Sequence, residues 1–316
     1  IKQKHYLKNG KYPIIDQSQN FVGGYSNNEE ITINIKKPVI VFGDHTRCFK
    51  YVDFNFIAGA DGIQILEPKE FFNEKLFYYF CLILDFPNKG YSRHYQYLAK
   101  TIIRIPPLTT QKQIAERLDF SFDKIDKALK LLNENKEYIK KYRLSILKSA
   151  FDGKLTHSSK NWEIKTLGEV CEILDNMRKP INATERKWRL KNSTFRYAYY
   201  GATGQIGYID NFLYDFEAIL LGEDGAPFLE PFKDKAYIVS GKYWVNNHAH
   251  ILKAKENISI NKFVCYFLNV LDYTPYVGGT TRLKLNQFSM KRIKITIPSI
   301  EIQKEIVSIL DKKFKS

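Results

Sequence analysis

The sequence predicts a mixed α/β (α+β) protein: two globular units with twisted mixed sheets, separated by long antiparallel coiled-coil helices. Two observations predict this class. Short runs rich in β-branched and aromatic residues alternate with Gly, Asp and Asn turns, and an uninterrupted helical pattern lies between two such regions. With 316 residues, 44% of them hydrophobic, the chain has enough apolar material for a core in each unit.

The central run from Thr110 to Phe151 has the apolar spacing of an amphipathic helix. Its apolar side chains recur at steps of three, four or seven residues, which keeps them on one helix face. Thr110 is expected to cap the first turn, with Gln113 reaching back to it in a capping box. At about 1.5 Å per residue this helix would be roughly 60 Å long, more than one small domain needs. We therefore expect it to pair with another helix, through Ile114, Leu118, Ile125, Leu129, Leu132, Ile139, Tyr142 and Ile146.

The segment that leads into this helix occurs a second time near the C-terminus. Residues Ile103–Asp119, IRIPPLTTQKQIAERLD, align with Ile295–Asp311, ITIPSIEIQKEIVSILD, without a gap. Further upstream, Gly90–Arg93 matches Gly279–Arg282 as G-x-[ST]-R, and the order of the blocks is the same. Each repeat therefore consists of one globular unit followed by one helix.

These repeats predict four segments: a first unit at 1–109, the central helix and its junction at 110–157, a second unit at 158–298, and the start of a second helix at 299–316. The second helix carries an apolar face of the same kind, with Ile306 and Leu310, so the two helices are expected to pair as an antiparallel coiled coil. The first unit has a shorter segment ahead of its tyrosine-rich block than the second. This difference predicts that the first unit is truncated, and the second helix, which stops at Ser316, is expected to be truncated as well.

Inside the units, short β-rich runs bounded by turn residues predict strands. We expect strands at 38–42, 62–66, 217–221 and 236–239, and a helix at 261–271.

The formal net charge of +15 favours a polyanionic partner. Every segment is mildly basic and none is a basic tail, which is typical of a chain that contacts phosphates over much of its length. The four cysteines lie far apart without a C-x-x-C pair, so we expect them to be reduced and partly buried. The longest apolar run, Leu76–Leu84, is about half a membrane span, and no charged leader precedes a hydrophobic segment. A cytoplasmic protein with no membrane partner is expected.

Several runs resemble the specificity (S) subunits of type I restriction–modification enzymes. LKSAFDGKLT at Leu147–Thr156 and IPPLTTQKQIAERLD at Ile105–Asp119 are similar to that family's junctions between helix and domain. YYGATGQIGYID at Tyr199–Asp210, LLGEDGAPF at Leu220–Phe228 and VFGDHTR at Val41–Arg47 are similar to runs in its target recognition domains.

The resemblance implies two target recognition domains, each reading one half of a split site in double-stranded DNA. It also implies helices that dock methyltransferase subunits, two of them expected, and through these the restriction/translocase subunits. No catalytic centre and no cofactor are implied for this chain; S-adenosylmethionine, ATP and Mg are expected on the partner subunits. The same architecture serves type IIB and IIG methylase-nucleases, so a specificity chain or domain of that kind stays an alternative. A coiled-coil scaffold without DNA readout is a further one.

Two motifs of enzymes do not occur in this sequence. It contains no Asn- or Asp-Pro-Pro-aromatic tetrapeptide, the amino-methyltransferase feature, and no G-x-x-x-x-G-K-[ST] loop for a nucleoside triphosphate. The sequence therefore favours recognition over catalysis.

Base recognition needs hydrogen-bond donors and acceptors on loops that reach a groove. In the second unit four loops fit: the basic segment 178–196, with seven Lys and Arg against one Glu, the Gly-rich turn 201–207, the acidic pair at 223–224, and the recurrent loop 280–282. Their candidate DNA contacts are Arg178, Lys179, Arg186, Lys187, Thr203, Gln205, Glu223, Asp224, Thr280, Thr281 and Arg282. In the first unit the candidates are Gln17, Ser18, Gln19, Asp44, His45, Thr46, Arg47, Ser92 and Arg93.

Each of these candidates has a plainer alternative. The basic segment can be a solvated face, the Gly-rich turn a simple turn, and the acidic pair the partner of a local lysine. Tyr25, Tyr199 and Tyr208 fit packing better than base stacking. His248 and His250 share one face of a predicted strand, which suits a metal, but without a carboxylate or Cys pattern nearby we expect them to bond with Asn246 and Asn247.

Overall fold

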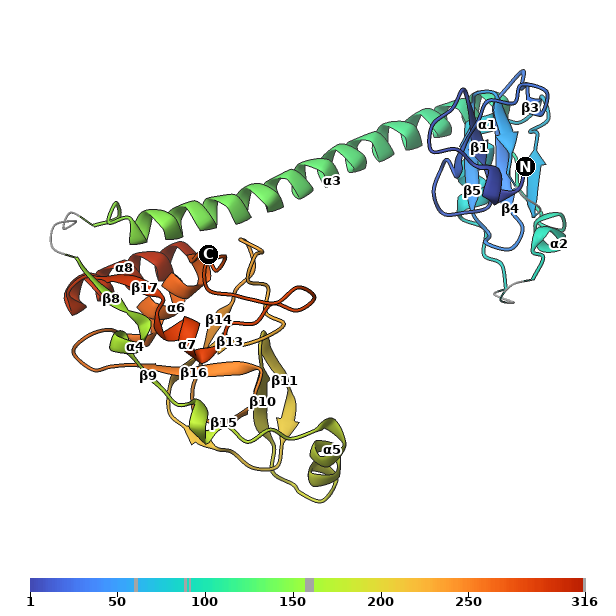
Figure 1. The fold of residues 1–316 in the computed structure, drawn as a ribbon. Helices are drawn as coiled ribbons and strands as arrows, with labels where there is room; N and C mark the ends of the chain where they lie inside the picture. The colour runs from blue at the N-terminus through green and yellow to red at the C-terminus, as the bar shows by residue number, and fades with distance from the viewer. Residues whose placement is uncertain (60–61, 88–89, 91, 157–161, 315–316) are drawn as a thin grey trace. The chain divides into compact units, whose positions relative to one another are not determined.

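The computed structural model describes residues 1–59, 62–87, 90, 92–156 and 162–314. Contacts divide the chain into two compact units, Ile1–Leu131 (unit one) and Leu132–Ser316 (unit two). The division falls inside a single helix, α3 (Leu108–Phe151), which Figure 1 shows as one continuous element. The expected boundary at 157–158 lies outside the described residues.

The described residues of unit one form two sheets and three short helices. The first sheet is mixed, in the order β2 (Gly24–Ser26), β1 (Tyr12–Ile15), β6 (Phe56–Ala58), β3 (Thr32–Ile33), with β1 parallel to β6 and the other pairs antiparallel. The second is antiparallel, in the order β5 (Phe49–Val52), β4 (Val39–Gly43), β7 (Ile63–Leu66). The helices are η1 (Gln3–His5), α1 (Glu74–Leu82) and α2 (Tyr95–Leu98). Strand β4, VIVFG, is buried along its whole length, because one face packs with Ile15 and Phe56 and the other with Cys81 and Phe86.

Unit two forms three sheets in the part of the chain that the structure describes. A mixed sheet has the order β11 (Gly204–Ile209), β10 (Tyr197–Gly201), β15 (Lys242–Val245), β12 (Tyr214–Asp215). An antiparallel sheet has the order β14 (Ala236–Val239), β13 (Ala218–Gly222), β16 (Ala249–Ala254), β9 (Cys171–Ile173), and β17 (Lys294–Ile297) pairs with β8 (Glu163–Thr166). The helical elements are α4 (Leu167–Val170), η2 (Asp175–Met177), α5 (Ala183–Lys191), α6 (Asn261–Val270), α7 (Gln287–Lys291) and α8 (Ile300–Phe314).

The two units share one topology. The order β2-β1-β6-β3 corresponds to β11-β10-β15-β12, with the same parallel pair at the centre and antiparallel pairs on both sides. The order β5-β4-β7 corresponds to β14-β13-β16. Strands β8 and β9 and helix α5 have no counterpart among the described residues of unit one. The internal repeat found in the sequence therefore extends to the sheet topology.

Each unit is joined to its helix by a buried glutamine. The Gln111 amide donates to Phe71 O (3.0 Å) and Pro106 O (2.8 Å), and its oxygen accepts from the Asn73 amide (2.8 Å). In unit two the Gln303 side chain donates to Ile258 O and Pro298 O, both at 2.9 Å, and accepts from Ser259 Oγ (2.8 Å) and Ile260 N (3.2 Å). The aligned glutamines thus perform the same task.

The expected capping box at Thr110 and Gln113 is wrong. Helix α3 begins at Leu108, so Thr110 lies within its first turn, and the first helical hydrogen bond runs from Gln111 N to Pro107 O (3.0 Å). Proline suits the start of a helix because it lacks an N–H that would go unsatisfied there. Pro107 thus flanks the first helical residue and accepts the first helical hydrogen bond.

The strands expected at 38–42, 62–66 and 217–221 are present within one residue of their expected ends, and the strand at 236–239 is confirmed. The helix expected at 261–271 ends at Val270. All four cysteines are reduced, as expected, and three are buried; burial raises the pKa of Cys81, Cys171 and Cys265 to about 12. Within the described part of the chain, no helix combines the length and apolarity needed to cross a membrane.

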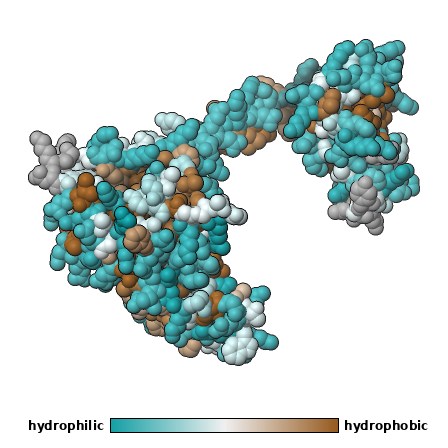
Figure 2. Space-filling view, viewed as in Figure 1, coloured by the Kyte–Doolittle hydropathy of each residue, from teal (hydrophilic) through white to brown (hydrophobic). Residues whose placement is uncertain are grey.

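The apolar stripe of α3 is covered only at its ends. Ile146 is buried in the core of unit two, the same core that contains Ile306 and Leu310, and Leu118 is partly buried in unit one. Between these two ends, each of the following side chains of the stripe is more than half exposed: Ile125, Leu129, Leu132, Ile139 and Tyr142. Figure 2 shows apolar surface on this helix. The helix pairing expected from the sequence therefore stays a prediction.

Candidate nucleic-acid interface

In unit two, predicted loops meet at the end of strand β13. The Glu223 amide donates to His248 O (2.8 Å), and the Leu285 amide donates to Glu223 O (2.8 Å). Gly278 and Lys284 exchange backbone hydrogen bonds of 3.0 and 2.8 Å and so close the recurrent loop that contains 280–282. The turn before β16 and the recurrent loop are thus both fixed to the residue that follows β13.

Unit one has the same convergence at the equivalent strand, β4. The Asp44 amide donates to Gly62 O (2.7 Å), just ahead of β7. The Asp44 carboxylate accepts from the backbone N–H groups of His94 and Tyr95, both at 2.7 Å, which fixes the chain directly after Arg93. The recurrent loop of unit one therefore ends beside Asp44, as that of unit two ends beside Glu223; Tyr91 within it lies outside the described residues.

Other predicted residues of unit one lie in the same place. His45 Nδ1 is 3.3 Å from Ser92 O. A Cβ added to Gly43 would lie 2.9 Å from the Gln17 Cβ, so the turn at 16–20 packs closely against the end of β4. The structure therefore brings together three segments that the sequence named separately.

Lys50 is a residue that the sequence analysis missed. Its side chain is 3% exposed, and its ammonium donates to Asp16 O (2.7 Å) and Asn20 O (2.6 Å). Asp16 in turn accepts from the Ser18 amide (2.9 Å) and hydroxyl (2.6 Å). This buried lysine, the one charged residue of the β5 run FKYV, fixes the turn that carries Gln17, Ser18 and Gln19.

Arg47 occupies a backbone conformation that non-glycine residues rarely adopt, with φ of 61°. The turn is closed by a hydrogen bond from Arg47 N to Gly43 O (2.7 Å), and the guanidinium donates to Phe86 O (3.4 Å). Such strain persists only where the surroundings enforce it, and it concentrates at functional sites.

A buried ion network lies behind the loops of unit two. Asp175 Oδ2 is 2.6 Å from His250 Nδ1, and His250 Nε2 is 2.7 Å from Leu285 O. Both ring nitrogens of His250 thus lie beside oxygen atoms of the protein. Burial alone would raise the pKa of Asp175, but the hydrogen bond and charge of His250 lower it below its usual value.

Glu223 and Asp224 both pair with local cations. Glu223 accepts from Arg178 Nη1 (2.7 Å) and lies 3.1 Å from Lys284 Nζ, the local lysine that the alternative interpretation required. Asp224 Oδ1 lies 2.7 Å from His248 Nδ1 and accepts from Arg282 Nη2 (2.8 Å). Although burial would raise the pKa of Glu223, Arg178 and Lys284 lower it. Contact of these carboxylates with bases stays a prediction.

The expected partners of the two histidines were wrong. Asn246 Oδ1 accepts only the backbone N–H of His248 (2.9 Å), whereas the imidazoles bond to Asp224 and Asp175. Ligand atoms of Asp175, Glu223 and His250 lie within 4.8 Å of one another. The Arg178 guanidinium and the Lys284 ammonium already balance these carboxylates, so we interpret the cluster as an ion network.

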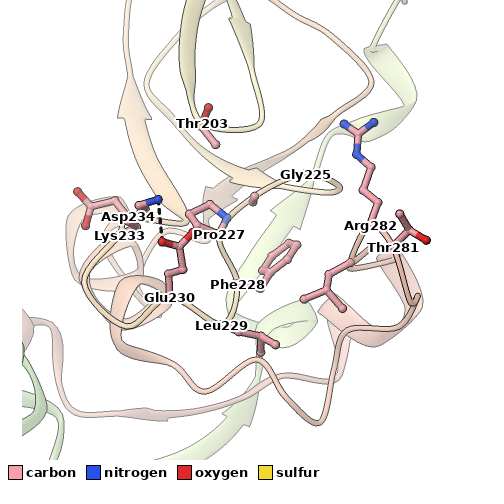
Figure 3. A pocket seen from close by; sticks show the side chains of 12 residues that line it. Thr203, Gly225, Pro227, Phe228, Leu229, Glu230, Lys233, Asp234, Thr281 and Arg282 are labelled. Carbon is pink, nitrogen blue, oxygen red and sulfur yellow. Dashed lines mark ion pairs between the residues drawn. The ribbon is translucent and has the colours of Figure 1, made fainter. Parts of the chain in front are cut away.

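A cleft of about 710 Å³ opens beside the recurrent loop (Figure 3). Thr203 of the Gly-rich turn and Thr281 and Arg282 of the recurrent loop all line it. Gly225, with φ of 65°, lies against Arg282: a Cβ there would be 2.8 Å from the guanidinium Nη2. The fold thus places residues from two predicted loops of unit two, the Gly-rich turn and the recurrent loop, around one cleft.

Most of the basic side chains of segment 178–196 lie on helix α5, whereas Arg178 lies at the end of β13. Helix α5 packs on β11, with the Arg186 guanidinium 4.5 Å from the centre of the Tyr199 ring. Arg178 is largely occupied within the protein, since it also donates to Ala249 O (2.9 Å). Tyr199 is buried, as expected for a packing residue, whereas Tyr208 is 53% exposed. Lys187 is exposed, and its predicted DNA contact is untested.

Comparison with known proteins places these features in a family. The family model described as "Type I restriction modification DNA specificity domain" matches residues 1–141 and 159–315. A putative type I restriction enzyme specificity subunit of Haemophilus influenzae is 34% identical over 149 residues, which are 47% of this chain and 36% of the relative. The EcoprrI specificity subunit of Escherichia coli is 26% identical over 149 residues, 47% of this chain and 35% of the relative. The match thus spans about a third of these relatives.

A solved structure described as the structural basis of complex assembly and conformational transition of the type I R-M system matches with a TM-score of 0.69. It is 13% identical, and the match covers 96% of this chain and 84% of that chain. This likeness shows a shared fold. Because the family model covers both units, including the loops that meet at β4 and β13, the chain belongs to the type I restriction–modification DNA specificity family.

Proposed function

We propose that the two units are target recognition domains, at 1–109 and 158–298, and that each reads one half of a split site in double-stranded DNA. The observation that supports this most is the repeated convergence of loops at the ends of β4 and β13. In both units the recurrent G-x-[ST]-R loop is fixed to the residue after the strand, Asp44 in one and Glu223 in the other. The same arrangement of loops in both units is expected of two related DNA-recognition domains.

The side chains that follow β4 and β13 differ, so the two DNA half-sites differ. Unit one presents Asp44, His45, Thr46 and Arg47 after its strand, and unit two presents Glu223 and Asp224 with Arg282 beside them. Base edges in the major groove are distinguished by their donors and acceptors. Different sets of side chains therefore select different bases.

The helical segments, at 110–157 and from 299 to 316, separate the two readers and dock partner subunits. The exposed apolar stripe of α3 supports this role, since isolated helices seldom leave such a stripe uncovered. The partners are two methyltransferase subunits and, through them, restriction/translocase subunits. This chain recognises DNA without catalysis, and the partners carry S-adenosylmethionine, ATP and Mg. In a type IIB or IIG system one chain would instead combine methylase and nuclease, and co-purification distinguishes the two cases.

Selection from a random duplex pool tests the proposal. The purified chain, with its methyltransferase partners where they co-purify, is expected to enrich two short unlike motifs separated by a gap of fixed length. Affinity should fall steeply as salt rises, because phosphate contacts release counterions. A pool without an enriched motif, together with salt-independent affinity, would contradict DNA readout and favour a scaffold.

A further inference from the structure

Helix α5 and the turn that follows it expose two large aromatic side chains. Trp188 is 67% exposed and Phe195 is 65% exposed. By contrast, Trp244 in the neighbouring sheet is 4% exposed and donates its indole N–H to Lys179 O (2.9 Å). Strand β11, on which α5 packs, adds the exposed Tyr208. Several large exposed apolar side chains on adjoining elements indicate a binding surface.

The backbone under these two aromatic residues is fixed. The Arg196 guanidinium donates to Leu190 O (2.9 Å), Ser193 O (2.6 Å) and Phe195 O (2.8 Å), which closes the end of α5. The Asn192 amide donates to Trp188 O (2.9 Å). Trp188 is thus presented from helix α5 and Phe195 from an ordered turn, so little further ordering is needed for them to bind.

The charge around them identifies the partner as a polyanion. Segment 178–196 has seven Lys and Arg against one Glu. Lys187 and Lys191 are four residues apart, hence on one face of α5, and adjoin Trp188. Figure 1 shows α5 at the edge of unit two beside β10 and β11, and unit one has no such helix among its described residues.

We propose, on the basis of the proposed function, that Trp188 is a wedge that enters between two base pairs of duplex DNA, with Phe195 supporting it. Lys187 and Lys191 bind the flanking phosphates and so bring the indole to the base step. Proteins that insert apolar side chains in this way unstack the step and kink the duplex. Unit two therefore deforms its half-site, whereas unit one reads its own without such a device.

The test uses the full chain and the duplex recovered from the random pool, with 2-aminopurine at successive positions of the unit-two half-site. Fluorescence of 2-aminopurine rises where a base is unstacked. The wild-type chain is expected to raise it at one step. Trp188→Ala should abolish this rise and weaken binding roughly tenfold, as loss of one stacked aromatic side chain does, without changing the salt dependence. Trp188→Phe should keep most of the fluorescence rise and most of the affinity. Phe195→Ala should lose less of each than Trp188→Ala does.

Two controls make the result specific. Lys187→Ala should lower the slope of log affinity against log salt by about one and keep the fluorescence rise. Tyr138→Ala removes an aromatic residue of matching exposure, 68%, from α3. It should leave the fluorescence rise and the affinity for DNA unchanged. If Trp188→Ala binds and unstacks DNA as the wild type does, the wedge is refuted, whether or not the variant loses a methyltransferase partner. A wild-type chain that enriches no motif would refute the proposed function and the wedge together.

Discussion

The two units have the same sheet orders and the same loop convergence, but different chemistry fixes the loops in each. In unit two, charged pairs do this: Asp175 with His250, and Glu223 with Arg178 and Lys284. In unit one, the Asp44 carboxylate accepts two backbone N–H groups at the recurrent loop, and a charged pair, Lys50 with Asp16, fixes only the turn at 16–20. The comparison teaches that the topology is set by the buried strands, while the polar contacts that fix the loops can differ from one copy to the other.

The contacts at the starts of α3 and α8 are alike in the two units. Gln111 and Gln303 are both buried and satisfy the same kinds of backbone group. Asp119 and Asp311 lie eight residues further on. Asp119 accepts from the hydroxyl of Tyr79 on α1, and Asp311 accepts from the hydroxyl of Tyr266 on α6. The junction between unit and helix is therefore the most constant part of the repeat.

Deleting the seven residues from Ile125 to Leu131 tests whether α3 sets the distance between the two readers. Seven residues are about two turns, so the stripe stays in phase while the helix shortens by roughly 10 Å. We expect either loss of sequence-specific DNA binding or a gap between the two half-sites that is shorter by about three base pairs. Sequencing of motifs from the duplex pool measures this, and an unchanged spacer would show that the helix does not set it.

Asp175→Asn tests the charged network of unit two. Removing one partner of a buried ion pair should destabilise this unit by about 3 to 5 kcal/mol at neutral pH. The pKa of Asp175 is lowered in the folded chain, so its contribution is present above the usual 3.8 and disappears as the pH falls through the lower folded value.

Urea unfolding of wild type and variant from neutral to acidic pH measures the difference. It should shrink below about 3.8, the usual pKa of an Asp carboxyl. A difference that does not change with pH would mean that the Asp175 charge contributes nothing to the stability of unit two. The stability of unit one should be the same in both proteins.

Gln111→Ala and Gln303→Ala test whether the two junctions are equivalent. Each removes three or more buried hydrogen bonds and leaves backbone carbonyls without a donor, which costs about 2 to 3 kcal/mol. Each should destabilise its own unit by a similar amount, measured by hydrogen exchange of the two units separately. Gln113→Ala changes an exposed glutamine two residues away and is the matched control. Unequal losses would show that the junctions only look alike.

Arg282→Ala and Arg93→Ala test the recurrent loops as readers. If Arg282 contacts a base, its loss should relax one position of the unit-two half-site by about 1 to 3 kcal/mol and leave the other half unchanged. Arg93→Ala should do the same for the unit-one half. Motif selection with each variant gives both results. Equal relaxation of both halves by either variant would assign that arginine a structural role.

The sequence by itself determined the features that depend on local period and on repetition. Apolar spacing located α3, alternating β-rich runs located β4, β7, β13 and β14, and the repeat of IRIPPLTTQKQIAERLD predicted a second globular unit followed by a helix. These features follow from neighbouring residues, because a helix or strand face is set by spacing alone. The same pattern also marked the recurrent loop and the residues after β4 and β13.

Only the tertiary structure decided which polar groups meet. His250 bonds to Asp175, 75 positions away, and Lys50 to Asn20, 30 positions away, and no local spacing signals either pair. The role of Gln111 at the start of α3 was missed for the same reason, since its side chain bonds to Phe71 and Asn73 on another segment. A buried polar group takes whichever partner the packed core brings near it, because leaving it unpaired is costly.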